Sequence, residues 1–289
     1  MIGDLAGRGA VVTGAASGIG LGIAEAFAAR GVNLFLIDID AEGLACAKAR
    51  LAENGAEVEI AALDVSDRAA VKDAAKTAAG FLGPIHILCN NAGVGYAGVP
   101  LDEVPDQDWD WVVNVNLMGV INGLQAFLPL IEAHGEGGHI VNTASIGGHH
   151  VMPGWGHGVY STTKFAVVGL SEALKDDLSA KNIGVSVLCP AAVDTAIYQG
   201  GRNRPERFGG PFERPLDHDL PALLKAGMAP IEVGRWVVRA IEDDVFYIFT
   251  HPATKEVIER RYARIQDAYA WAERVAGEIE TQDNVGDGA

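Results

Sequence analysis

The feature that most constrains the fold is a series of short apolar runs separated by longer segments with helical periodicity. The runs lack the polar alternation of half-exposed strands, so each is typical of a strand that helices cover on both faces. They lie at 10–13, 32–37, 58–63, 85–89, 139–142, 185–188 and 246–249. The helical segments lie at about 19–30, 41–54, 67–82, 107–133, 158–181 and 231–243. This alternation, with right-handed crossovers, predicts an α/β fold with a doubly wound parallel sheet of about seven strands, flanked by helices on both faces.

The length and composition favour one large domain. A chain of 289 residues that is 49% hydrophobic can bury one sizeable core. The stretch at 191–230 is rich in Pro and Gly, and we expect an irregular insertion there with one short helix, acting as a lid over the substrate. A C-terminal helical extension is expected at about 253–280, with its long helix at 253–275, and an acidic end at 277–289.

The charge and the cysteines exclude several classes of function. A formal charge of −16 repels nucleic-acid phosphates and anionic lipid, so neither is an expected partner. The cysteines have no paired or metal-type spacing, which indicates a reducing, cytoplasmic setting; they are Cys46, Cys89 and Cys189. We find no leader-like beginning and no membrane-spanning run, so the expected protein is neither exported nor embedded.

A glycine-rich turn directly follows the first predicted strand and leads into a helix. Glycines let the backbone turn sharply and let a pyrophosphate approach the amides at a helix N-terminus. The candidate phosphate-binding residues of this turn are Gly14, Ser17, Gly18, Ile19 and Gly20. At the end of the second strand, about 20 residues further on, Asp38 can accept hydrogen bonds from ribose hydroxyls and repels a 2′-phosphate. The pattern therefore predicts a dinucleotide site that prefers NAD, and its alternative is an ordinary turn with a solvated acid.

Tyr160 and Lys164 lie four residues apart in a predicted helix, so their side chains share one face. A nearby ammonium lowers the pKa of a phenol from its ordinary value near 10 toward the range where it can exchange protons at neutral pH. General acid–base catalysis is most effective in that range. The spacing indicates a proton-transferring pair, and its alternative is a chance pair on a solvated helix.

Together these motifs resemble the short-chain dehydrogenases/reductases, in their single-domain, Rossmann-like, NAD-dependent branch. The resemblance covers roughly residues 5–250 and depends on the glycine turn, Asp64, 90–93, Asn116, Ser145, 160–164 and the Pro190 turn. It implies that Asp64 and Val65 bracket the adenine. It implies a ribose edge lined by Asn91, Ala92 and Gly93, and a nicotinamide site near Val193 and Thr195. Ala191 stands where the family commonly has glycine.

The same resemblance assigns catalytic roles. Tyr160 exchanges the substrate proton while hydride passes between the substrate carbon and the nicotinamide, and Lys164 also holds the nicotinamide ribose. Ser145 orients the substrate oxygen, and Asn116 locally kinks the long helix and holds a water that relays protons to Lys164. Considered separately, Ser145 is better explained as a loop residue and Asn116 as a buried structural amide, and only the complete set favours the catalytic roles.

The loop between Ser145 and Tyr160 is expected to border the substrate. Its Met152 and Trp155, with Val94 and Tyr96 from an earlier loop, indicate an apolar or aromatic pocket for a bulky secondary alcohol. The segment 246–252 and the long helix after it resemble a subset of the family that acts on aryl or terpenoid-like alcohols, which implies a cyclic or aryl substrate. Three histidines also lie in this loop, at His149, His150 and His157, but they lack partners at metal-ligand spacing, so we expect no metal there.

The sequence thus predicts an NAD-dependent oxidation of a secondary alcohol to a ketone. The alternatives are a ketone reductase that uses the same residues, and a nucleotide-sensing protein without catalysis. The resemblance also implies a homodimer or homotetramer formed through the helices at 107–133 and 158–181. The second of these offers Phe165, Val167, Val168 and Leu170.

Overall fold

The structure, a computed structural model, describes residues 4–213 and 219–286. The chain divides into two compact units, Met1–Thr250 and His251–Ala289. The described part of the second unit contains a 3-10 helix at Pro252–Thr254 and the helix α9 at Lys255–Gly286. The segment expected to be helical at 253–275 therefore begins in the 3-10 helix and continues in α9. The expected lid at 191–230 and the acidic end at 277–289 extend in part outside the described residues.

The first unit contains a seven-stranded sheet in which all described pairs of strands are parallel. Its strand order is β3-β2-β1-β4-β5-β6-β7, so the order reverses between β1 and β4. The strands are β1 Gly9–Thr13, β2 Asn33–Asp38, β3 Val58–Ala62, β4 Ile85–Asn90, β5 Gly138–Thr143, β6 Ile183–Leu188 and β7 Tyr247–Ile248. The predicted doubly wound sheet is therefore confirmed, although its last strand is shorter than expected.

The helices of the first unit alternate with these strands, as the periodicity predicted. They are α1 Gly18–Ala28, α2 Ala41–Glu53, α3 Arg68–Leu82, α4 Asp106–Val113, α5 Gly119–Ala133, α6 Gly158–Asp177, α7 Leu220–Lys225 and α8 Pro230–Asp243. One difference is that a π-helical turn at Asn114–Met118 separates α4 from α5 within the predicted helix at 107–133. Such turns are frequent at functional sites.

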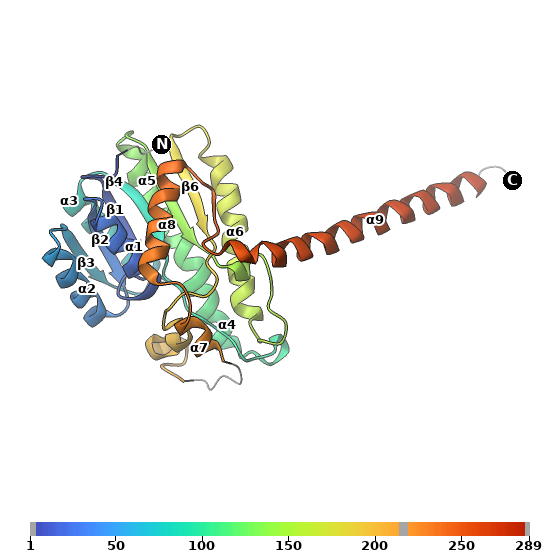
Figure 1. Cartoon of the computed structure of the whole chain (residues 1–289), viewed down its shortest axis with the longest axis horizontal. Coiled ribbons are helices and arrows are strands. Elements are labelled where there is room, and N and C mark those ends of the chain that lie inside the picture. Colours follow the sequence, from blue (N-terminus) through green and yellow to red (C-terminus); the bar gives the residue numbers. More distant parts are fainter. Residues whose placement is uncertain (1–3, 214–218, 287–289) are drawn as a thin grey trace. The chain divides into compact units, whose positions relative to one another are not determined.

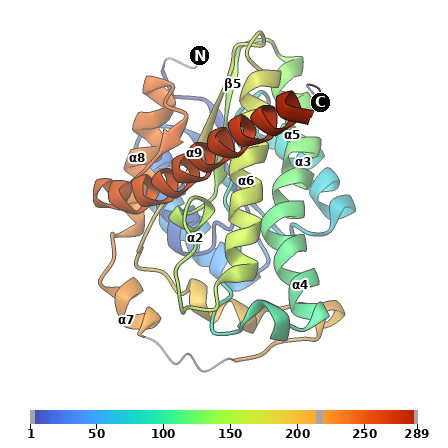
Figure 2. The same cartoon turned by 90° about the vertical axis from the view of Figure 1, so that its right-hand side faces the viewer.

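Strand side chains alternate between two cores, one on each face of the sheet. Ala10 and Val12 face a core completed by α1, α2 and α8, whereas Val11, between them, faces a second core completed by α3, α4 and α5. Figure 1 shows α1 and α8 side by side over the first face. On the other face, α6 runs beside the helix made by α4 and α5 (Figure 2).

The segment at 106–133 is long and apolar enough to cross a membrane by length and composition. Half of its apolar window is buried inside the fold, where Phe127 and Ile131 pack in the second core. This burial is what the core helix of a folded α/β unit shows.

Candidate active site

The glycine turn, residues 13–20, lies at the carboxyl end of β1, where the strand order reverses. Gly14 has a φ of +67°, and a Cβ there would lie 2.7 Å from the Cα of Ala92. A Cβ on Gly20 would lie 2.0 Å from the carbonyl oxygen of Gly14. Both positions therefore require glycine, and the backbone stays open beside the N-terminus of α1. This cradle fits a pyrophosphate, and the place is where ligands bind in open α/β sheets.

Asp38 ends β2 next to this turn. Its Oδ2 accepts a hydrogen bond from the Ala16 amide at 2.9 Å, and its Oδ1 accepts one from the Asp40 amide at 3.0 Å. Burial raises the pKa of this carboxyl, while the backbone hydrogen bonds oppose that rise. The Asp38 carboxylate thus links the end of β2 to the glycine turn. This is the position at which the sequence predicted a contact with the cofactor ribose.

Asp64 and Val65 follow β3 at the same edge of the sheet. Val65 is buried, and its carbonyl oxygen accepts a hydrogen bond from Asn122 at 2.9 Å. Asp64 forms an ion pair with Arg207, a residue of the insertion that the sequence analysis did not identify. Arg207 Nη2 lies 2.6 Å from Asp64 Oδ2. The expected adenine end therefore includes a side chain of the insertion.

Asn91 connects the loop after β4 to the glycine turn. Its side-chain amide donates to the carbonyl oxygen of Thr13 at 3.0 Å. In return, Thr13 Oγ1 accepts hydrogen bonds from the amides of Asn91 and Ala92 at 2.9 and 3.0 Å. Thr13 was not among the predicted site residues, although a threonine at a strand end beside a glycine turn could have indicated this role. Gly93 follows, and a Cβ there would lie 3.5 Å from Lys164 Nζ.

The two ends of the insertion, residues 191–230, lie side by side. Val193 and Met228 form a parallel bridge, and the Asp194 amide donates to the Met228 carbonyl oxygen at 2.9 Å. Thr195 lies beside the glycine turn, because a Cβ on Gly18 would be 3.1 Å from its Cγ2. Val193 itself is buried in the first core. In its described part the insertion contains one short α-helix, α7, as the sequence predicted, and also two 3-10 segments at Ile197–Asn203 and Glu206–Phe208.

Tyr160 and Lys164 share one face of α6, as their spacing predicted. Lys164 Nζ lies 5.6 Å from the centroid of the Tyr160 ring and donates a hydrogen bond to the Thr143 carbonyl oxygen at 2.8 Å. Thr143 Oγ1 in turn lies 3.3 Å from Asn91 Oδ1. A continuous set of contacts therefore runs from the glycine turn through Asn91 and Thr143 to Lys164.

The pKa values of the pair differ from the simple expectation. Burial raises the pKa of Tyr160 above its ordinary value, and a hydrogen bond with Ser145 opposes that rise. Burial also lowers the pKa of Lys164 to about 8. The sequence predicted that the pKa of Tyr160 is lowered, but in the protein it is raised. The reason is that desolvation of the phenolate outweighs the hydrogen bond from Ser145 that favours it.

Ser145 and Asn116 are the two other predicted catalytic residues. Ser145 lies two residues beyond the end of β5, and its Oγ accepts a hydrogen bond from the Gly147 amide at 3.0 Å. Asn116 lies in the π-helical turn and is fully buried; its Oδ1 accepts from the Val94 amide at 2.7 Å, and its Nδ2 donates to the Val94 carbonyl oxygen at 2.9 Å. These bonds hold the loop after β4, which is the structural role considered as an alternative for Asn116.

The loop between Ser145 and Tyr160 places aromatic groups near the pair. The His157 ring lies 6.0 Å from the Tyr160 ring and 5.5 Å from the Trp155 ring. His149 is buried instead, with its Nε2 3.4 Å from Cys189 Sγ. Tyr96, expected to line the pocket, is also buried, and its hydroxyl donates to Asp108 at 2.7 Å. Of the predicted pocket residues, Trp155 therefore lies near Tyr160, with His157 between the two rings, whereas Tyr96 is buried.

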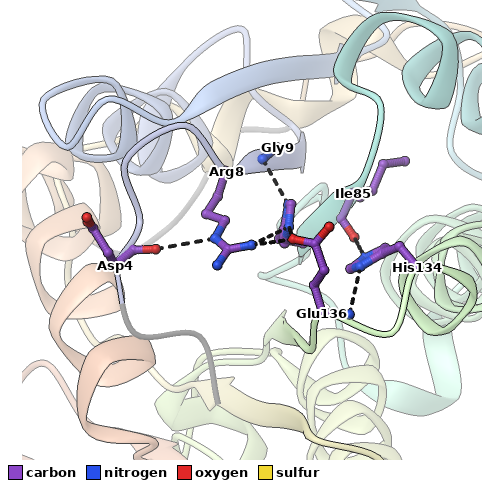
Figure 3. Close-up of polar contacts among 7 residues, drawn as sticks. Asp4, Arg8, Gly9, Ile85, His134 and Glu136 are labelled. Carbon is purple, nitrogen blue, oxygen red and sulfur yellow. Dashed lines mark hydrogen bonds and ion pairs between the residues drawn. The ribbon is translucent and has the colours of Figure 1, made fainter.

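One group among the described residues has its potential metal ligands within 4.8 Å of one another: His86, His134 and Glu136. It lies at the amino ends of β4 and β5, away from the candidate site. Figure 3 shows the Arg8 guanidinium among these side chains, with Nη1 2.7 Å from both His86 Nε2 and Glu136 Oε2. His134 uses both ring nitrogens, with Ile85 O at 2.9 Å and the Glu136 amide at 3.2 Å. The Arg8 guanidinium already supplies a positive charge between His86 and Glu136, so this group of side chains favours a structural role over metal binding.

The fold and the glycine cradle place this chain in the class of Rossmann-like proteins, whose ligands bind at the carboxyl edge of the sheet. Comparison with known proteins narrows this class. The profile of the short chain dehydrogenase family matches residues 8–205. The chain belongs to this family, the short-chain dehydrogenases/reductases, and is an oxidoreductase that acts on alcohol groups or on the carbonyls derived from them.

Three similar proteins cover nearly the same length. A CLA biosynthesis dehydrogenase/reductase of Lactiplantibacillus plantarum is 35% identical over 88% of this chain and 91% of its own length. A 1-deoxy-11-beta-hydroxypentalenate dehydrogenase of Streptomyces avermitilis is 37% identical over 84% of each chain. The crystal structure of a short chain dehydrogenase/reductase from Burkholderia phymatum, in complex with NAD, is 38% identical with a TM-score of 0.87, over 92% of this chain and 96% of that one.

Proposed function

We propose that this protein oxidises a bulky cyclic or aryl secondary alcohol to a ketone and prefers NAD over NADP. The observation that carries the proposal is the continuous set of contacts from the glycine turn to Lys164 and Tyr160. These contacts link the glycine turn to Tyr160 and Lys164 at one edge of the sheet, which supports a nucleotide site beside a proton-transferring pair. The name of the hydroxypentalenate dehydrogenase supports a cyclic substrate, and the NAD-bound structure supports this cofactor.

The preference for NAD follows from charge. Asp38 lies beside the glycine turn with both carboxylate oxygens held by backbone amides. A 2′-phosphate placed there would meet a like charge, whereas ribose hydroxyls would find acceptors. Bound NAD would accept a hydride from the substrate carbon.

The chain's own residues would handle the proton. In oxidation, Tyr160 Oη in its deprotonated form takes the alcohol proton as the carbon–oxygen double bond forms. Ser145 positions the substrate oxygen by hydrogen bonding, and the Lys164 ammonium stabilises the negative charge on Tyr160. Trp155 and His157, close to Tyr160, form part of the wall against which a large ring would pack.

One observation favours the reverse direction as a second candidate. The raised pKa of Tyr160 keeps the phenol protonated at neutral pH, and that is the form which donates a proton during ketone reduction. In this direction the carbonyl carbon would accept the hydride from bound NADH, and Tyr160 gives its proton to the oxygen, which completes the alcohol.

The experiment is a panel of cyclic, aryl and steroidal secondary alcohols with NAD, and of the matching ketones with NADH, followed by NADH absorbance. We expect turnover with wild type, none with Tyr160→Phe, and unchanged turnover with Tyr262→Phe, a control in the exposed part of α9. NADH affinity of the Tyr160→Phe variant should change little. Undiminished turnover by Tyr160→Phe would reject the mechanism, and tighter binding of NADPH than of NADH would reject the cofactor preference.

We also propose that the protein is cytoplasmic and assembles as a homodimer or homotetramer through α4, α5 and α6. Of the apolar residues named for α6, Val167 and Val168 are buried in the chain's own core. Phe165 and Leu170 stay partly exposed and support a smaller apolar contact than the sequence suggested. Light scattering of the purified protein measures the number of subunits.

A further inference from the structure

Arg207 is a residue of the insertion that lies beside Asp64 at the carboxyl edge of the sheet. Its Nη2 is 2.6 Å from Asp64 Oδ2 and 2.6 Å from Ser66 Oγ. The Asp64 side chain is largely buried, whereas about half of the Arg207 side chain is exposed. The contact joins residues 143 positions apart in the sequence, so it is a tertiary contact between the insertion and the end of β3.

The three residues form a closed hydrogen-bonded group that fixes the carboxylate. Asp64 Oδ1 accepts hydrogen bonds from the Ser66 amide at 2.9 Å and from the Ser66 hydroxyl at 2.7 Å. Its Oδ2 accepts from Arg207. A carboxylate oxygen has about two acceptor sites, so Oδ2 keeps one that points away from Arg207. An amino group is the kind of donor that this site would take.

The backbone on both sides of Arg207 is anchored. Arg204 forms a buried ion pair with Asp108 at 2.7 Å, and Phe208 is buried in the second core. Because both ends of the short segment are fixed, Arg207 is held over the edge of the sheet without a further cost in backbone entropy. The segment therefore keeps Arg207 beside Asp64 at this end of the sheet.

The position of Asp64 and Arg207 relative to Asp38 indicates which part of the cofactor they would contact. Asp38 pairs with Ala62 in adjacent parallel strands, and Asp64 follows two residues beyond Ala62. Neighbouring strands lie about 4.8 Å apart, so the two carboxylates flank one short stretch of the edge. If Asp38 binds the ribose, Asp64 and Arg207 border the space where the attached base must lie.

We propose that Arg207 is an adenine-site residue, contributed by the insertion, which holds the Asp64 carboxylate in position to accept a hydrogen bond from the exocyclic amino group. The inference rests on the proposed NAD-dependent function and adds a determinant outside the motifs of the family. Arg207 acts through Asp64 and is therefore a positioning residue. Its removal should weaken binding of the adenosine half and leave the nicotinamide half unaffected.

The test compares two reduced cofactors, NADH and NMNH, the latter lacking the adenosine half, by fluorescence titration of the full-length protein. Because the ion pair is half exposed, we expect Arg207→Ala to weaken NADH binding about two- to fivefold. NMNH binding should not change. Arg207→Lys should restore part of the loss, and Arg202→Ala, an exposed arginine of the same insertion, should bind both like wild type.

A double-mutant cycle separates positioning from a simple effect of charge. In an Asp64→Ala background, Arg207→Ala should produce no additional loss of NADH affinity, because the carboxylate that it positions is gone. An equal additional loss would overturn the proposal, and so would unchanged or tighter NADH binding by Arg207→Ala alone. If wild type binds no NADH, the proposed function fails as well; if only the Arg207 effect is missing, this inference alone fails.

Discussion

Lys164 Nζ donates a hydrogen bond to the main-chain carbonyl oxygen of Thr143, 2.8 Å away at the end of β5. This contact fixes a buried ammonium beside the Tyr160 ring and the loop that holds Gly93. Burial lowers the pKa of Lys164 to about 8, so the amine is still mostly protonated at neutral pH. Its charge is therefore available to oppose the desolvation that raises the pKa of Tyr160.

We predict that Lys164→Met lowers kcat on the order of a hundredfold or more, because the variant lacks the cation that stabilises the Tyr160 phenolate. NADH binding should weaken far less than turnover. The measurement is steady-state kinetics on the best alcohol of the panel, with circular dichroism to show that the fold persists. Turnover within a few-fold of wild type would show that Tyr160 does not need the ammonium.

Asp38→Asn should shift the cofactor preference toward NADP by about tenfold or more. The amide oxygen can still accept the hydrogen bond from Ala16, but the negative charge that opposes a 2′-phosphate is gone. The ratio of kcat/KM for NADP and NAD measures the effect. Asp40→Asn is a suitable control, because Asp40 caps α2 through the Gly43 amide and asparagine caps equally well. An unaltered ratio in Asp38→Asn would contradict the assignment of the ribose site.

The buried ion pair between Arg204 and Asp108 should be a major determinant of stability. Both side chains are at most 4% exposed, and Arg204 also lies over the rings of Trp111 and Phe212. Arg204 Nε and Nη2 have no hydrogen-bond partner among the described residues, so Asp108 provides the balancing charge. Asp108→Ala would leave a buried cation uncompensated and should cost about 3–5 kcal/mol of unfolding free energy.

Urea denaturation measures this loss, and an exposed ion pair provides the matched control. Arg239 and Asp243 are 72% and 42% exposed, so Asp243→Ala should cost less than about 1 kcal/mol. If the two variants were equally stable, the Arg204–Asp108 pair would not anchor the insertion as described.

Stability should fall as the pH drops from about 6.5 to 4, in part because of His139. This ring is buried and contacts Ser186 Oγ at 2.8 Å, and burial lowers its pKa to about 4. Between pH 6.5 and 4 the unfolded chain binds a proton that the folded protein excludes, so folding loses on the order of 3 kcal/mol over this range. Burial also lowers the pKa of His86, which acts in the same direction.

Thermal or urea unfolding at pH 7 and pH 4.5 measures this dependence. His139→Asn should be less stable than wild type at pH 7, because the contact with Ser186 changes, but it should lose less stability on acidification. His251→Asn, outside the sheet, serves as the control. An equal acid-induced loss in wild type and His139→Asn would show that His139 does not contribute.

Local patterns in the sequence were enough to predict the framework of the site. Apolar runs without polar alternation indicate strands buried on both faces, and the residues that follow those strands necessarily gather at one edge of a parallel sheet. For this reason Gly14 and Asp38 could be placed together before any coordinates, and the resemblance to the family added Asn91, Ser145 and Tyr160 to the same site. The spacing of Tyr160 and Lys164 defines a shared helix face wherever the helix lies.

Tertiary structure alone decided which distant side chains complete that edge. Arg207 reaches Asp64, Arg204 reaches Asp108, and Asn116 holds Val94, because the insertion and the π-helical turn pack where they do. Periodicity reports which face of an element is buried, but it carries no information about the partner on that face. The direction of the Tyr160 pKa also depends on burial, and burial is a property of the packed molecule.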